Sequence, residues 1–127
     1  MNLRDTDTLD RKFQKDLNTG IAALVLLGVL KGATEPMYGY QIIKELKDRS
    51  RGYFSFKEGT LYPALHRLEK SGLIEGKWQA LPSGQQRKYY YITEKGYASL
   101  ALQRSSWREF LNAMNLIIRP EEVRDSI

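Results

Sequence analysis

The spacing of apolar residues predicts a mostly helical chain with one hairpin. Leu9, Phe13 and Leu17 recur every four residues and lead into the apolar run 21–30, a pattern typical of one long helix. Helical periods separated by turn and capping residues predict three more helices, and alternation of apolar and polar residues predicts two strands. The expected helices cover about 8–31, 38–49, 57–71 and 94–118, and the expected strands cover 74–79 and 87–93.

The last expected helix carries an apolar seam along one side. Its residues follow the 4-3-4-3-4 spacing of a coiled coil, with Arg104 as the one polar member. A single short domain cannot easily bury so long a seam, so we expect a homodimer, and packing on the chain's own N-terminal helix is the alternative. The residues expected at the dimer interface are Leu9, Phe13, Leu100, Trp107, Phe110, Leu111, Met114 and Ile118.

All of the excess positive charge lies in the middle of the chain. Twenty basic and 15 acidic residues give a net charge of +5. Residues 44–70 carry seven basic and four acidic side chains, residues 71–95 carry four and two, and each end is neutral. A basic surplus indicates a polyanionic partner, either nucleic acid or an anionic membrane surface.

The order of the expected elements is that of a winged helix-turn-helix. In this arrangement the second helix of a pair enters the DNA major groove, and the hairpin that follows reaches the flanking backbone. The excess charge lies on these same elements. We therefore expect a mainly α fold with a small β-hairpin: an N-terminal helix and winged helix-turn-helix over 1–95, a dimerisation helix over 96–119 and a tail over 120–127.

The composition argues against several other classes of protein. The chain has no cysteine and one histidine, which excludes a disulfide scaffold, a thiol nucleophile and a zinc site built on sulfur. It has no glycine-rich phosphate loop and no Gly-x-Ser-x-Gly motif, so we expect no enzyme, metal or cofactor. The apolar run 21–30 is shorter than the roughly 20 residues that span a membrane, so we expect a cytoplasmic protein without a membrane partner.

Three stretches of sequence resemble the PadR family of transcriptional regulators. They are MYGYQIIKEL at 37–46, GTLYPALHRLEKSGLIEGKW at 59–78 and GQQRKYYYITEKG at 84–96. The resemblance spans roughly residues 18–114, and the single C-terminal helix is similar to the short subfamily that includes multidrug-binding regulators. The resemblance implies a homodimer that binds a palindromic operator, usually represses transcription and often responds to phenolic acids or hydrophobic drugs.

The candidate DNA contacts lie on the second and third expected helices and on the wing. Arg67 is the best candidate to bind a base edge, because a guanidinium can donate two hydrogen bonds to one base. Tyr38, Tyr40 and Tyr62 face either DNA or the core, and the sequence leaves both open. The expected contacts are Tyr38, Tyr40, Lys57, Thr60, Tyr62, Pro63, Arg67, Lys70, Gln85, Arg87, Lys88 and Tyr89.

Trp107 is the candidate effector residue. It stands in the middle of the seam, where it and its dimer mate could form flat walls for a planar apolar molecule, with Leu111 and Met114 lining the site. An ordinary interface tryptophan is the alternative. Trp78 is expected to pack between wing and body. An architectural DNA-binding protein and a partner-binding adaptor, each without an effector, are the alternative functions.

Overall fold

The computed structural model describes residues 3–118, with side chains from residue 8 onward, and the tail expected over 120–127 lies outside this range. The mainly helical fold with a small β-hairpin is confirmed. The elements in chain order are α1 (Leu3–Lys31), β1 (Met37–Tyr38), α2 (Gly39–Arg49), α3 (Glu58–Lys70), β2 (Ile74–Ala80), β3 (Gln86–Ile92) and α4 (Glu94–Ile117).

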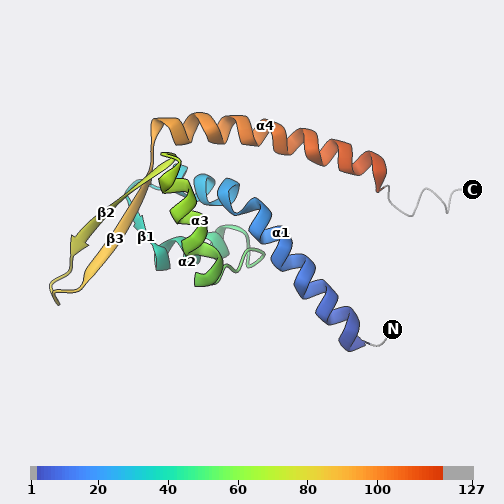
Figure 1. Ribbon diagram of the computed structural model, residues 1–127, viewed down its shortest axis with the longest axis horizontal. Coiled ribbons are helices and arrows are strands. Elements are labelled where there is room, and N and C mark those ends of the chain that lie inside the picture. The colour runs from blue at the N-terminus through green and yellow to red at the C-terminus, as the bar shows by residue number, and fades with distance from the viewer. Residues whose placement is uncertain (1–2, 119–127) are drawn as a thin grey trace, which may run out of the picture.

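The elements form a body from which three arms extend. Helices α2 and α3, the sheet and the C-terminal half of α1 make up the body (Figure 1). The β2–β3 hairpin projects from one side of the body. The N-terminal half of α1 and the C-terminal half of α4 leave on the other side and diverge from each other.

The sheet has three antiparallel strands in the order β1-β3-β2. Strands β2 and β3 pair from Ile74 opposite Ile92 to Ala80 opposite Gln86. Strand β1, which the sequence analysis did not predict, pairs Tyr38 with Tyr89. A strand of two residues is too short to show an alternating pattern, so the sequence predicts a helix that begins at Tyr38 instead. The strand ties the start of α2 to the hairpin.

The apolar run of α1 forms the centre of the core. Leu26 and Leu27 are completely buried, and they pack with Ile42 of α2, Leu65 of α3 and Ile74 of β2. By length and composition, residues 8–31 could cross a membrane, so the apolar part of this helix is longer than the run 21–30 alone indicated. Its most apolar turns are nevertheless part of the core of the chain.

A tight turn joins α2 to the loop before α3. Arg51 and Gly52 both have positive φ angles, 54° and 83°, and the N–H of Phe54 donates to Oγ of Ser50 at 2.8 Å. Helix α3 begins at Glu58, as expected, and continues without interruption through Pro63. The two helices are therefore joined as the expected helix-turn-helix.

The start of α4 is fastened to the turn that follows α3. Thr93 caps α4, accepting from the N–H of Gly96 at 3.0 Å, and its hydroxyl donates to the carbonyl oxygen of Gly72 at 2.7 Å. Nζ of Lys95 donates to the carbonyl oxygen of Ser71 at 2.8 Å. Gly96 is buried, and a Cβ atom there would lie 2.1 Å from the carbonyl oxygen of Leu73. This junction leaves room for no larger residue than glycine.

Candidate nucleic-acid interface

Helix α3 has one buried and one exposed face. Leu61, Leu65 and Leu68 pack in the core at helical spacing. The outer face exposes Tyr62, Pro63, His66, Arg67 and Lys70, and Lys57 is exposed just before the helix; Thr60 is half-buried. Side chains able to bind phosphate or base edges thus share one surface.

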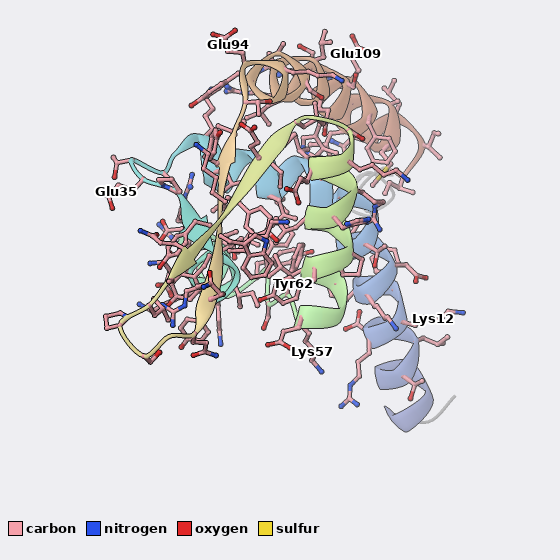
Figure 2. All side chains as sticks on the ribbon, turned by 60° about the vertical axis from the view of Figure 1, so that its left-hand side comes forward. Lys12, Glu35, Lys57, Tyr62, Glu94 and Glu109 are labelled. Atoms are coloured by element: carbon pink, nitrogen blue, oxygen red, sulfur yellow. The ribbon has the colours of Figure 1, made fainter. Side chains whose placement is uncertain are left out.

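The N-terminal end of α3 and the tip of the hairpin lie on the same side of the molecule. Figure 2 shows Lys57 and Tyr62 at the N-terminal end of α3, on the side where the hairpin tip lies. Glu94 and Glu109 of α4 lie at the opposite side. A recognition helix and a wing presented together are the arrangement that a winged helix-turn-helix requires for contact with one DNA segment.

Tyr62 has both a packing role and an exposed edge. It is 45% exposed, and its ring lies against Gly39 at the start of α2, where a Cβ atom would come within 2.4 Å of the Tyr62 hydroxyl. The glycine therefore lets the first turns of α2 and α3 approach closely. Tyr62 is thus packed on one side and accessible on the other, and its contact with DNA stays a prediction.

The other tyrosines near the start of α2 differ in exposure. Tyr40 is 67% exposed, whereas Tyr38 is half-buried, with its ring edge-to-face with Tyr89 at 5.5 Å. The guanidinium of Arg87 lies over the Tyr38 ring at 4.0 Å. A cation stacked in this way is held in place while its N–H groups can still donate. Tyr40 is thus the accessible tyrosine, and Tyr38 is the one that holds the wing arginine.

Lys88, the next residue of the wing, is engaged by helix α3. Its Nζ is 2.7 Å from Oε1 of Glu69, and both side chains are largely covered, at 25% and 29% exposure. The hydrogen bond to the Glu69 carboxylate raises the pKa of Lys88 above its ordinary value of 10.5. Burial raises the pKa of the neighbouring Tyr90 hydroxyl, which keeps this phenol neutral. The contact between Lys88 and Glu69 was not predicted from the sequence.

A cleft of about 470 Å³ separates α3 from the wing. It brings together four of the expected contacts, Tyr38, Tyr62, Arg87 and Lys88. His66, Glu69, Trp78 and Gln86 also line it and were not among them. The strand alternation contained a signal for Lys88, because residues 88, 90 and 92 share the face that packs on the body.

Two residues of the hairpin lie nearer to solvent than to the body. Trp78 was expected to pack between wing and body, and this was wrong, because it is 67% exposed. It shares a face with Ile74, but the hairpin has passed the edge of the core by that position. Gln85 is exposed beside Gly84, whose φ angle of 90° forms the turn at the tip.

A groove of about 550 Å³ lies between α1 and α4. Leu17, Ile21 and Leu24 line one wall, and Leu102, Trp107 and Phe110 line the other. The rings of Trp107 and Phe110 stack with centroids 5.5 Å apart. Leu111 and Met114, expected beside Trp107 at an effector site, do not belong to this groove and are about one-third exposed.

The residues expected at a dimer interface divide into two groups. Leu100 is 8% exposed and packs in the core of its own chain. For this residue the structure agrees with the alternative, packing within the chain. The remaining residues lie toward the diverging ends of α1 and α4, where Trp107 is half-buried and the others are exposed. These are Leu9, Phe13, Phe110, Leu111, Met114 and Ile118.

Comparisons with known proteins agree with this geometry. Residues 26–102 match the model of the transcriptional regulator PadR-like family. The chain is 35% identical to transcriptional regulator Rv3488 of Mycobacterium tuberculosis over 100 residues, covering 78% of this chain and 83% of that one. A PadR family regulator from Eggerthella lenta superposes with a TM-score of 0.78 at 27% identity, covering 93% of this chain and 99% of that one. A transcriptional regulator from Clostridium thermocellum gives a TM-score of 0.74 at 28% identity, covering 82% and 99%. The chain therefore belongs to the PadR-like family of transcriptional regulators.

Proposed function

We propose that this regulator represses transcription in the cytoplasm by binding a palindromic DNA operator as a homodimer. The observation that carries the proposal is the surface that α3 and the wing share along their cleft, with the N-terminal end of α3 and the hairpin tip on the side away from α4. The excess positive charge of the chain lies on the segment 44–95 that forms this surface. Phosphate attraction would bring the protein to DNA, and base contacts from α3 would select the operator.

Arg67 is the proposed base-reading residue. It is exposed in the last turn of α3, on the outer face away from the leucines that fix the helix in the core. Phosphate contacts are proposed for the other exposed polar groups of α3 and its N-terminus, for Tyr40 and for the wing. These are Lys57, Thr60, Tyr62, Lys70, Gln85, Arg87 and Tyr89, with Pro63 and Tyr38 shaping the surface between them.

Footprinting on the DNA upstream of the gene and its neighbours tests this assignment. We expect protection of a near-palindrome whose half-sites lie about one helical turn apart. Arg67→Ala should weaken specific binding by about 1–3 kcal/mol if the guanidinium binds a base. Arg108→Ala, which removes the same charge from an exposed position on α4, is the control. Unchanged operator affinity in the Arg67→Ala, Arg87→Ala double variant would refute the site, and binding without sequence preference would favour an architectural protein.

The homodimer is proposed from the apolar arms of α1 and α4. Phe13 is 63% exposed, and Leu116 and Ile117 are 70% and 81% exposed. Apolar side chains repeated along two protruding helices form a surface that soluble monomers rarely leave uncovered. A second copy supplies the matching surface by two-fold symmetry.

Light scattering at micromolar concentration tests the dimer. Leu111→Asp should give monomers or aggregates, because dimerisation would bury an unpaired carboxylate. Asn112→Asp, at an exposed polar position of the same helix, controls for the same change of one charge. A monodisperse wild-type monomer would refute the proposal, and a stable complex with another protein would favour the adaptor alternative.

The effector is proposed to be a planar apolar or aromatic molecule that binds against Trp107. The stacked pair Trp107–Phe110 forms a flat apolar wall of the groove between α1 and α4. In the dimer, Leu111 and Met114 of either copy can complete the site. A coupling free energy of about 1–3 kcal/mol would change operator affinity by roughly 5- to 150-fold.

Tryptophan fluorescence tests the effector proposal in a Trp78→Phe background whose operator affinity has first been measured. A panel of flat dyes, drugs and phenolic acids is titrated, so that Trp107 is the reporting residue. We expect quenching that Trp107→Ala abolishes and a lower operator affinity in the presence of the bound compound. If a compound binds but operator affinity does not change, Trp107 is an ordinary interface residue and the effector proposal is refuted.

A further inference from the structure

We propose that Glu69, Lys88 and Gly76 form a clip that fixes the angle between the wing and the recognition helix α3, and that Lys88 is a positioning residue with no phosphate contact. The inference deepens the proposed function and rests on it for the effect on DNA. It assigns Lys88 a different role from the phosphate contact that the basic wing sequence suggests.

The contacts of Lys88 carry the argument. Its ammonium group reaches across the cleft to the Glu69 carboxylate at 2.7 Å, joining β3 to the last turns of α3. The same Nζ atom lies 5.7 Å from the centre of the Trp78 ring and 5.5 Å from the centre of the Tyr90 ring. The positive charge is therefore compensated by a carboxylate and two aromatic faces before any DNA is present.

Gly76 provides the space through which the lysine passes. A Cβ atom at this position would lie 2.4 Å from Cε of Lys88 and 3.2 Å from Oε2 of Glu69. Gly76 stands opposite Tyr90 in the β2–β3 register, on the face of the hairpin that turns toward α3. A glycine in a strand marks a close approach of another group, and here that group is the lysine stem.

The position of the clip explains why the wing needs it. The core ends near Tyr90, which is 7% exposed, and Trp78, two pairs further along the hairpin, is 67% exposed. Packing alone therefore gives the outer hairpin little support. The clip lies at this boundary and is matched on the opposite face of β3 by Arg87 over Tyr38. Successive strand residues point to opposite faces, so Arg87 attaches the wing to Tyr38 of β1 and Lys88 attaches it to Glu69 of α3.

Operator affinities of two variants, measured as a function of salt concentration, distinguish a clip from a phosphate contact. The direction of the affinity change decides in one variant, and the salt slope decides in the other. Glu69→Gln raises the net charge by one, so simple electrostatics predicts tighter DNA binding. If Glu69 holds the wing, we expect the variant to bind the operator about 3- to 30-fold more weakly. Lys88→Met should weaken binding by a similar factor, and its salt slope should stay near that of the wild type. Loss of a phosphate contact would lower the slope by about one.

Three further variants complete the test. Glu58→Gln removes an exposed carboxylate from the first turn of the same helix and controls for charge. Gly76→Ala displaces the lysine without changing any charge and should weaken binding like Glu69→Gln. The exchanged pair Glu69→Lys, Lys88→Glu should restore most of the affinity that either single change removes.

Hydrogen exchange of wing peptides from 74–92 without DNA gives a readout that does not depend on operator binding. We expect faster exchange in Glu69→Gln and Lys88→Met and recovery in the exchanged pair, with urea unfolding confirming that the variants are folded. Wild-type exchange rates in both single variants would overturn the clip, as would tighter DNA binding by Glu69→Gln. Absence of any specific operator for the wild type would refute the proposed function instead, and the exchange data would still decide on the clip.

Discussion

Replacement of Gly96 by alanine tests the junction between α3 and α4 most directly. The added Cβ would lie 2.1 Å from the carbonyl oxygen of Leu73 and 2.7 Å from Cγ1 of Ile92, whereas ordinary contacts begin near 3.4 Å. The first of these neighbours is backbone, so α4 and the turn after α3 must separate by about 1.3 Å to remove the overlap.

The expected magnitude follows from three contributions. Overpacking of this kind costs about 1–3 kcal/mol. Separation would also weaken the Thr93 cap, which is worth about 1 kcal/mol. Alanine is favoured over glycine within a helix by about 1 kcal/mol, which offsets part of the loss. We therefore expect Gly96→Ala to lower the free energy of unfolding by about 1–3 kcal/mol.

Urea unfolding followed by circular dichroism measures this difference at one fixed protein concentration, because association would otherwise change the apparent stability. Gly28→Ala is the matched control, since a Cβ there meets no atom within 4 Å. It should stabilise the protein by about 0.4–1 kcal/mol. Equal stabilisation by both substitutions would refute the argument that the junction is closely packed.

Three further predictions concern other parts of the body. Thr93→Ala should cost about 1 kcal/mol in urea unfolding through loss of the α4 cap, and an unchanged midpoint would contradict this. Leu65→Ala should cost about 2–5 kcal/mol, because the side chain is fully buried, and a smaller loss would mean that the core relaxes around it. The pKa of Lys88 is raised in the folded chain, so its stabilising contribution is complete below pH 10.5 and is lost as the pH rises through the raised value. The stability difference between wild type and Lys88→Met should therefore be constant from pH 7 to about 9 and shrink above pH 10.5, and a difference that persists there would argue against a charged pair.

Periodicity predicted the elements that carry a long repeating pattern. The leucines of α3 and the apolar run of α1 fall on buried positions because burial of one helix face produces the 3.6-residue spacing. The cap at Thr93 was predictable for a similarly local reason, since the hydroxyl and the N–H that it accepts from are three residues apart. Strand β1 was missed because two residues are too few to show any period.

The errors and omissions concern contacts between distant parts of the chain. Strand alternation predicts Trp78 on the same face as Ile74, but it cannot show that the hairpin extends beyond the core at that residue. Glu69 and Lys88 are 19 residues apart, and their pairing depends on how the hairpin folds back on α3. Leu100 continues the seam of α4 in sequence, yet the helix is still in contact with the body at that turn.

The junction at Thr93 and Lys95 also makes α4 a lever. The helix has 24 residues and so extends ~36 Å from its anchored end. A sideways displacement of ~3 Å at the far end corresponds to a rotation of ~5° about that anchor. Because the start of α4 is hydrogen-bonded to the turn directly after α3, such a rotation would act on α3. In the proposed homodimer, a small molecule bound between two such helices would therefore change the angle between the two α3 helices.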